Sequence, residues 1–229
     1  MRMISYILML FLLGACNNKE HNDLIEYAYK GKVKTMVEVY QLNDRYGTGK
    51  PNQPIKTIYY YSPVGALIKV EKYNLVESGK LLVNYVATYS RKNGRPAEYK
   101  AVNRKGKLEE SGTYHWEDDQ HYTLRIDMGN KLRSENAFVL DDEGRMQQRT
   151  MQIFNDTVRK LYLITDLIYN DSGEIIRTRQ HDPNAGQDVS TGIYTAARDA
   201  MGNGTLLYYI DEKRMDTVGK VERTFTYYR

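Results

Sequence analysis

The chain has 229 residues, a formal net charge of +4, and 21 tyrosines against four phenylalanines and one tryptophan. It contains no run of five or six like charges of the kind that forms a nucleic-acid-binding arm, so we expect no nucleic-acid partner. Tyrosine favours strands and packs its ring while its hydroxyl stays hydrated, so the composition favours a β-rich domain with many partly exposed positions.

The first sixteen residues have the pattern of a secretory signal. Arg2 gives a positive start, residues 4–13 are almost uninterruptedly apolar, and Leu13-Gly14-Ala15 leads into Cys16, the only cysteine. The apolar run is too short for a membrane-spanning helix, which needs about 20 residues. The Leu-Gly-Ala-Cys ending resembles the lipobox of bacterial lipoproteins. That resemblance implies removal of residues 1–15 and acylation of Cys16, by palmitate for example. A plain signal peptide with an incidental cysteine is the alternative.

The lipoprotein interpretation predicts how the rest of the chain is organised. Removal of 15 residues from 229 leaves 214, enough for one large domain. We expect lipidated Cys16 to hold the protein at the outer membrane, with the periplasmic and the surface face both open. Residues 16–24 are polar and read as a tether, and residues 25–229 as a single β-repeat domain.

Alternation of apolar and polar side chains with a period of two predicts strands along most of the chain. It is clearest at residues 33–40, 122–128 and 221–227. Convincing helices are few. Residues 188–200 are interpreted as holding one or two helical turns, and residues 23–29 are ambiguous between helix and strand.

Glycine turns recur between these segments, with Ser, Asn or Asp three residues before several of the glycines. The intervals Gly65–Gly94, Gly144–Gly173 and Gly173–Gly202 are each 29 residues, whereas Gly106 divides the remaining stretch into intervals of 12 and 38. Glycine supplies the positive φ that hairpin reversal needs, and Asn or Asp bonds the local backbone. The spacing predicts a degenerate repeat of strands and turns.

One part of the chain resembles a known family. The segment Gly31-Lys-Val-Lys-Thr-Met-Val-Glu-Val-Tyr40, followed by turns such as Tyr169-Asn-Asp-Ser-Gly173, resembles YD/RHS-like and MORN-like repeat lipoproteins of the Bacteroidota. The resemblance covers residues 25–180, although Leu140 and Arg198 replace the tyrosine in two turns. It implies a long antiparallel meander and no catalytic residues. We therefore expect an all-β fold, an elongated antiparallel meander of ten to thirteen strands in a single curled or open sheet.

The hairpin around His115–His121 is the densest polar and aromatic segment. Its rings, Tyr114, Trp116 and Tyr122, form a candidate ligand surface, because aromatic rings stack on sugars and nearby carboxylates accept hydrogen bonds from hydroxyls. An ordinary solvated turn is the favoured alternative. A metal site in this hairpin is the less favoured one, because no third histidine or cysteine stands at a ligand spacing, and no metal or other cofactor is predicted.

Two short motifs suggest modification. Asp156-Thr157-Val158 and Asp216-Thr217-Val218 resemble the Asp-Thr-aliphatic O-glycosylation acceptor of Bacteroidota, which would make Thr157 and Thr217 acceptors. A polar turn that enters a strand is the alternative. The Asp141-Asp-Glu-Gly144 segment lacks the alternating ligands of a calcium loop and is interpreted as a turn.

The sequence contains no nucleophile, metalloprotease or phosphate-loop motif, so no catalytic residues are assigned and the protein is predicted not to be an enzyme. The leading hypothesis is a binding or scaffolding module for a glycan or a protein partner, with an exposed sheet edge as one means of capture. A hydrolase of envelope polymers or polysaccharides and an immunity-like, antitoxin-like partner protein are the alternatives.

Overall fold

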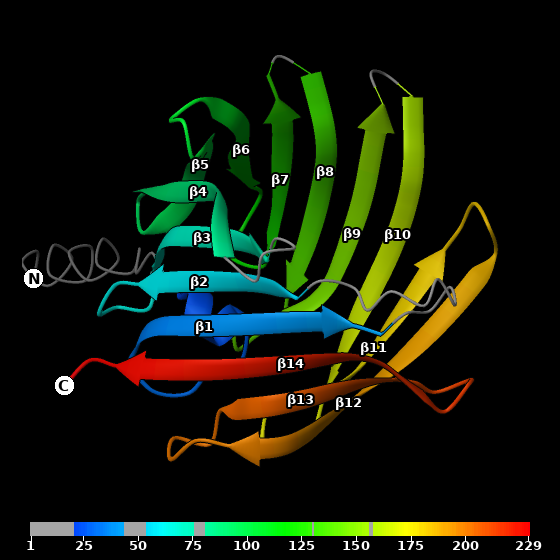
Figure 1. Ribbon diagram of the computed structural model, residues 1–229. Coiled ribbons are helices and arrows are strands. Elements are labelled where there is room, and N and C mark those ends of the chain that lie inside the picture. Colours follow the sequence, from blue (N-terminus) through cyan, green and yellow to red (C-terminus); the bar gives the residue numbers. More distant parts are fainter. Residues whose placement is uncertain (1–20, 44–53, 76–80, 130, 156–157) are drawn as a thin grey trace, which may run out of the picture.

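The structure is a computed structural model that describes residues 21–43, 54–75, 81–129, 131–155 and 158–229. In these residues one short helix, α1 (Asp23–Glu26), precedes fourteen strands (Figure 1). The strands are β1 (Val33–Leu42), β2 (Ile55–Tyr61), β3 (Leu67–Leu75), β4 (Leu81–Lys92), β5 (Arg95–Asn103), β6 (Leu108–Trp116), β7 (His121–Met128), β8 (Lys131–Leu140), β9 (Met146–Asn155), β10 (Val158–Tyr169), β11 (Ile175–Asp182), β12 (Gln187–Arg198), β13 (Gly204–Asp211) and β14 (Asp216–Tyr227).

The strands form a closed barrel in which each strand pairs antiparallel with the next in chain order. The ring is completed by β1 and β14, which pair from Val33↔Tyr227 to Leu42↔Gly219 (Figure 1). The predicted antiparallel meander is therefore confirmed. The expectation of a curled or open sheet is wrong, and so is the strand number of ten to thirteen. Closure pairs the two terminal strands and removes the free edge at which a partner strand was expected to add.

The two segments considered for helix differ in outcome. Residues 187–198 form strand β12, consistent with the β-branched Val189, Thr191 and Ile193 within it. The segment after Asn22 does form a short helix. The Asn22 side chain accepts a hydrogen bond from the Leu24 backbone N–H at 2.9 Å and so caps α1.

The glycine turns follow the expected chemistry. In the β10–β11 turn, Asn170 Oδ1 accepts hydrogen bonds from the backbone N–H groups of Ser172 and Glu174. Asp141 and Asp199 make the equivalent bonds in the β8–β9 and β12–β13 turns. Positive φ is confirmed at the repeat glycines, namely Gly65, Gly94, Gly144, Gly173 and Gly202.

The inner face of the barrel is apolar and rich in tyrosine. Adjacent strands place Met36, Tyr59, Val70 and Ala87 opposite one another, and all four belong to or pack against the buried clusters. A further cluster on the far side contains Tyr122, Phe138, Leu140 and Met146. The core thus lines the inside of the wall instead of lying between two layers.

The outer face carries charged side chains. Lys69 and Glu71 flank buried Val70, and their side chains form an ion pair of 2.9 Å. Lys220 and Glu222 likewise flank buried Val221 and pair at 2.5 Å. Neighbours in a strand point to opposite faces, so these charges project outward. In the part of the chain that the structure describes, no helix is long and apolar enough to span a membrane.

Candidate functional site

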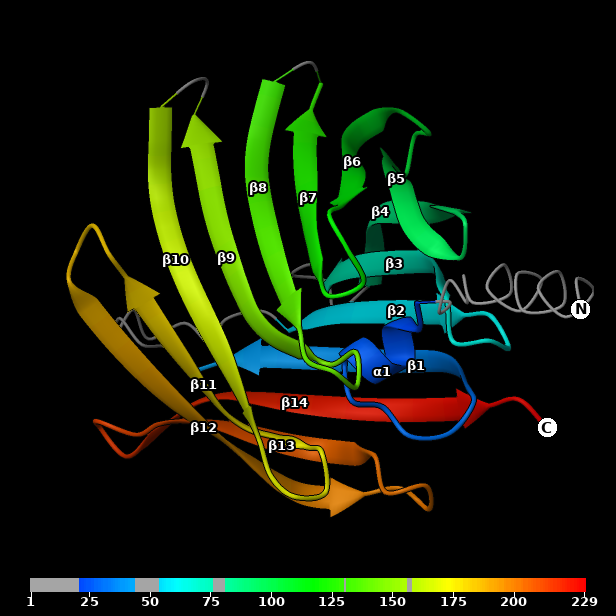
Figure 2. The same ribbon diagram turned by 180° about the vertical axis from the view of Figure 1, so that it is seen from behind.

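One end of the barrel is occupied by the segment of residues 21–27, here called the plug. Helix α1 lies inside the ring of strands (Figure 2), where Leu24 is buried against Val33, Met36 and Tyr61. Residues 21–24 were assigned to the tether, yet Asp23 and Leu24 are buried and the His21 side chain is only 8% exposed, so the folded unit reaches back at least to His21. The polar composition of residues 21–23 concealed this, because strands of the barrel wall supply the hydrogen bonds of buried Asp23.

The plug is held by hydrogen bonds from several strands. Asp23 Oδ2 accepts one from the Leu67 backbone N–H at 2.5 Å and one from the Arg91 guanidinium at 2.7 Å. The same guanidinium donates to the His21 backbone oxygen. Glu26 Oε1 accepts a hydrogen bond from the Tyr122 hydroxyl at 2.7 Å. These bonds connect α1 to strands β3, β4 and β7.

Buried charges in the plug shift one another's protonation. Burial lowers the pKa of His21, but the Asp23 and Glu26 carboxylates outweigh that effect and raise the pKa to about 9. Burial raises the pKa of Asp23, yet His21 and Arg91 bring it below its usual value. Carboxylate, imidazole and guanidinium therefore neutralise one another inside the barrel end.

The structure brings together the three aromatic residues singled out in the sequence. The ring centroids of Trp116 and Tyr122 are 4.4 Å apart, and those of Tyr114 and Tyr122 are 6.0 Å apart. Tyr122 is buried and stacks on Phe138 at 4.5 Å. Trp116 is half-buried, and its indole N–H donates to the Pro96 backbone oxygen at 3.0 Å. Tyr122 thus belongs to the core, and Trp116 is the ring that borders the open end.

The polar side chains at the tip of this hairpin mainly stabilise the turn itself. Asp118 Oδ1 accepts hydrogen bonds from the backbone N–H groups of Gln120 and His121, each at 2.7 Å. These bonds, the Gln120 N–H first among them, and the His121 side chain lower the pKa of Asp118. Among the described residues, the side chains that converge closely enough to share one ion are those of His21, Asp23 and Glu26, not those of the hairpin.

An open pocket of about 710 Å³, here called the mouth pocket, lies beside Trp116. It is lined by plug residues, by Trp116 and Arg95, and by the β6–β7 and β8–β9 turns, that is by His21, Asn22, Ile25, Arg95, Trp116, Asp118, Asp119, Gln120, Leu140, Asp141, Asp142, Glu143 and Gly144. The two turns are joined because the Gln120 amide donates to Asp142 Oδ1 at 2.8 Å. The pocket therefore has an aromatic wall and a rim rich in hydrogen-bond acceptors.

Arg95 is the guanidinium that borders this acidic rim. It lies 5.1 Å from the Trp116 ring centroid, donates to the Asp118 backbone oxygen at 3.1 Å and pairs with the Asp119 carboxylate. A cation next to the indole and several carboxylates around it give both donors and acceptors for a polyhydroxylated ligand. No acid–base pair poised over a nucleophile is evident in these contacts.

A second cavity of about 270 Å³ lies deeper inside the barrel. Tyrosines form much of its wall, together with the polar side chains of Glu110, Asn136 and Arg149. Asn136 is fully buried and accepts a hydrogen bond from the Arg149 guanidinium at 2.7 Å. Asp23 and Glu26 border this inner cavity, whereas His21 borders the mouth pocket, so the plug separates the two spaces.

Of the remaining sites named from the sequence, Thr217 lies within the described residues. Cys16 and Thr157 lie outside the described residues. Thr217 is exposed on β14, opposite Ile210, at a position accessible to modification. Sequence reasoning missed His21, Asp23 and Glu26. The available signal was the capping Asn22 before Leu24 and Ile25, which marks a short helix start and argues against a featureless tether.

Solved structures resemble this chain in fold, whereas no family model and no curated protein matches it. Among solved structures, a porin-like protein from Bacteroides vulgatus has 11% identity and a TM-score of 0.49, covering 86% of this chain and 98% of that one. A porin-like protein from Bacteroides uniformis has 12% identity and a TM-score of 0.43, again covering 86% and 98%.

A third solved structure, the Photorhabdus luminescens Tc holotoxin pore with a mutation in TccC3, has 13% identity and a TM-score of 0.34. It covers 77% of this chain and 12% of that one. With all identities at or below 13% and all TM-scores below 0.5, no activity or ligand is transferred from these proteins. The fold established for this chain is an all-β, fourteen-stranded closed antiparallel barrel.

Proposed function

We propose that this protein is an outer-membrane lipoprotein whose barrel binds a glycan in the mouth pocket. The observation that carries the proposal is the pocket itself, in which the half-buried Trp116 is surrounded by exposed carboxylates, the Gln120 amide and the Arg95 guanidinium. Aromatic rings with a polar surround suit sugars, which present apolar ring faces and hydroxyls together. A protein partner remains the alternative occupant.

The anchoring part of the proposal rests on Cys16 and on the outer face of the barrel. Charged side chains at the lipid-facing midplane of a membrane barrel cost about 2–4 kcal/mol for Arg or Lys, and membrane barrels carry an apolar outer band. Here Lys69, Glu71, Lys220 and Glu222 project outward from strands whose inner positions are apolar. We therefore place the barrel in water beside the membrane and assign attachment to the acyl chains.

Chain length limits how far the pocket lies from the anchor. Four residues lie between Cys16 and His21, which makes five steps along the chain. An extended chain spans at most about 3.6 Å per step, or about 18 Å in all. His21 borders the mouth pocket. In the lipidated protein this pocket would thus lie close to the membrane surface.

The lone tryptophan makes the proposal directly testable. Trp116 borders the pocket and is the only tryptophan, so its fluorescence reports on this site without a label. Soluble residues 17–229 are titrated with a panel of glycans and peptidoglycan fragments. Saturable fluorescence change with one panel member is the expected result.

A matched pair of variants tests whether the pocket is the site. Asp142 and Asp171 occupy the same position in consecutive glycine turns, and both are exposed, but only Asp142 borders the mouth pocket. Removing a charge-assisted hydrogen bond costs about 1.5–3 kcal/mol, or about 10–100-fold in affinity. Asp142→Ala is expected to weaken binding by that factor and Asp171→Ala to leave it unchanged. Equal binding by both variants would contradict the assignment of the pocket.

A further inference from the structure

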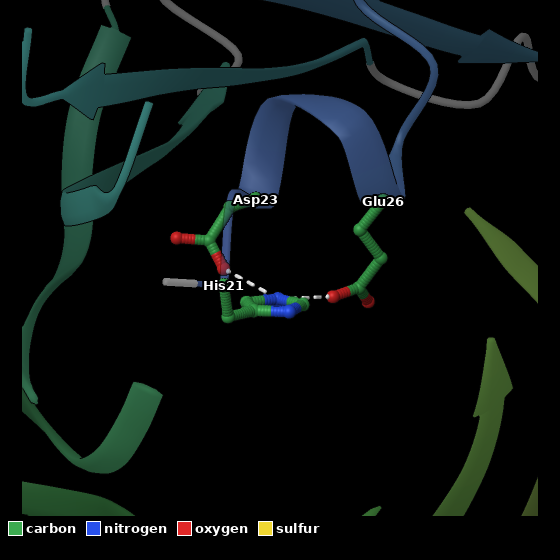
Figure 3. A group of neighbouring side chains, drawn as sticks. All are labelled: His21, Asp23 and Glu26. Carbon is green, nitrogen blue, oxygen red and sulfur yellow. Dashed lines mark ion pairs between the residues drawn. The ribbon is translucent and has the colours of Figure 1, made fainter. Parts of the chain in front are cut away.

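Three side chains of the plug converge on one point inside the barrel end. His21 Nε2 lies 2.8 Å from Glu26 Oε2 and 3.3 Å from Asp23 Oδ1. Figure 3 shows the imidazole ring between the two carboxylates. The donor atoms of the three residues all lie within 4.8 Å of one another. The single turn of α1 produces this arrangement, because it brings Glu26 back toward His21.

Each carboxylate presents one oxygen to this point while the barrel holds the other. Asp23 Oδ2 is bound by the Leu67 N–H and the Arg91 guanidinium, which leaves Oδ1 facing His21. Glu26 Oε1 is bound by the Tyr122 hydroxyl, which leaves Oε2 facing His21. Outer hydrogen bonds of this kind orient the ligands of protein metal sites. The two free oxygens are therefore fixed in place by strands β3, β4 and β7.

The imidazole provides a second, independent observation. The His21 side chain is only 8% exposed and packs against the Trp116 ring at 5.0 Å and the Tyr122 ring at 6.3 Å. Within the described ranges, its Nε2 is a buried nitrogen that has no hydrogen bond of acceptable geometry, despite the short approaches of the carboxylates. A buried nitrogen that approaches two carboxylate oxygens as an ion pair but forms a hydrogen bond with neither is suited to a shared ligand.

The separations agree with one coordination sphere. Bonds from zinc to histidine nitrogen and carboxylate oxygen are about 2.0–2.2 Å long, so ligands about 90–110° apart lie about 2.8–3.6 Å from each other. The distances from Nε2 to the two oxygens, 2.8 and 3.3 Å, fall in this interval. The two carboxylate oxygens lie within 4.8 Å of each other, so the three atoms can close around one small cation by bringing the carboxylates together.

We propose that His21, Asp23 and Glu26 form a binding site for a divalent transition-metal ion, with Zn²⁺ as the ion best matched to it. One imidazole and two carboxylates differ from the all-oxygen sets that Mg²⁺ and Ca²⁺ prefer. Metal binding displaces the His21 proton to solvent, and two carboxylates with the resulting neutral imidazole give a neutral complex with a divalent ion. Three protein ligands leave a further position for water or a ligand. Through the outer hydrogen bonds, the ion fixes the plug in the barrel end.

Calorimetric titration of Zn²⁺ into chelator-treated residues 17–229, which include the whole described barrel, tests the proposal without any glycan. One ion per chain is expected for the wild type. His21→Ala and Glu26→Gln should each weaken binding by at least about 100-fold. His181→Ala is the matched control, because His181 pairs with Asp188 at 2.6 Å in an exposed position, and it should leave binding unchanged.

A second measurement applies if the ligand variants do not fold. The wild-type chain loaded with Co²⁺ should show visible d–d absorption that Zn²⁺ abolishes, and Mg²⁺ should not abolish it. Failure of the wild type to bind Zn²⁺ stoichiometrically, or unchanged binding by a folded His21→Ala variant, overturns the proposal. A wild type that binds Zn²⁺ but no glycan would refute the function proposed above while the metal site stands.

Discussion

One polar side chain of this barrel, that of Asn203, takes the place of backbone pairing at a point that the strands do not reach. Asn203 is 4% exposed, and its Oδ1 accepts a hydrogen bond from the Lys30 N–H at 2.7 Å. Its Nδ2 donates to the Lys30 carbonyl at 2.8 Å and to the Tyr227 hydroxyl at 2.8 Å. One amide thus reproduces a pair of strand hydrogen bonds and joins the chain before β1 to the β12–β13 turn.

Replacement of this amide is predicted to destabilise the fold. Asn203→Ala leaves the Lys30 N–H and carbonyl without these partners in a part-buried site, at about 1–3 kcal/mol for each unsatisfied group. We expect a total loss of about 2–4 kcal/mol in chemical denaturation. Asn84→Ala, at an exposed position, is the control and should stay within about 0.5 kcal/mol. A loss no larger than that of the control would contradict the role of Asn203.

The buried tyrosines predict that the fold loses stability at alkaline pH, where their hydroxyls ionise. Burial raises the pKa of Tyr29 to about 12, reinforced by Glu38 and opposed by Arg223. The pKa of Tyr29 in the folded protein exceeds the value of about 10 in the unfolded chain. The contribution of neutral Tyr29 to the free energy of unfolding is therefore complete below about pH 10 and is lost as the pH rises through about 12. Tyr29→Phe should therefore lose less stability than the wild type over that interval.

Denaturation curves at several alkaline pH values would measure this difference. Tyr194→Phe, at a side chain that is 60% exposed, serves as the control and should follow the wild type. Parallel pH profiles of the wild type and Tyr29→Phe would exclude the predicted contribution.

At the scale of elements, the 29-residue spacing is one strand pair with its turns. The glycines of this series all lie in turns at the plugged end, whereas Gly106 lies in the β5–β6 turn at the opposite end. Gly106 is therefore not a member of the series, and its distances from Gly94 and Gly144 are 12 and 38 residues instead of 29. The β6–β7 turn, Glu117–Gln120, belongs to the series but has no glycine. Asp118 satisfies the backbone there.

Strand glycines have a different role, and Gly112 gives the sharpest test. Gly112 on β6 lies opposite Tyr99 on β5, and a Cβ built on Gly112 would overlap the Tyr99 ring. Tyr99 is itself buried, and its hydroxyl donates to Glu110. Gly112→Ala is therefore expected to cost about 1–3 kcal/mol through overpacking.

Gly192 on β12 is the matched control for this substitution. A Cβ there meets Glu212 no closer than 3.4 Å, an ordinary contact. Gly192→Ala should be neutral or stabilise the protein by up to about 1 kcal/mol, since it restricts the unfolded chain. Thermal melts of both variants decide the matter, and equal melting temperatures would rule out the close packing of Tyr99 on Gly112.

At the scale of the whole molecule, fourteen strands enclose more space than one lining of side chains fills, because barrel diameter grows with strand number. The plug and the tyrosine rings occupy part of that space, and the mouth pocket and the inner cavity remain. The charged side chains on the outer face suit contact with water, and the aromatic rings on the inner face suit contact with a ligand. The proposed function assigns attachment to a membrane to Cys16.

The proposed attachment through Cys16 predicts how a Cys16→Ser variant behaves. Without the acylated cysteine, the protein should leave the membrane fraction and stay in aqueous solution without detergent. Fractionation of cells, with labelling by a palmitate analogue, measures both effects, and the control is the wild type, which should be labelled and sediment with membranes. A Cys16→Ser protein that remains in the membrane and needs detergent would indicate a spanning barrel and contradict the anchored one.

The sequence by itself determined the all-β class, the antiparallel meander and the positive φ of the repeat glycines. Those features depend on neighbouring residues, through the alternation along a strand and the Ser, Asn or Asp that precedes the repeat glycines. Closure was decided only in three dimensions, because pairing of Met36 with Phe225 joins residues almost a full chain apart. Local alternation is the same in an open sheet and in a barrel.

The same reason accounts for the candidate sites. Sequence reasoning selected Tyr114, Trp116 and Tyr122 because they are close in the chain, and the barrel does bring their rings together. The convergence of His21 with Asp23 and Glu26 depended on burial of a polar segment. That burial is possible only because Leu67, Arg91 and Tyr122, from three distant strands, supply its hydrogen bonds. A buried polar group is stable when partners are present, and only the tertiary structure supplies them.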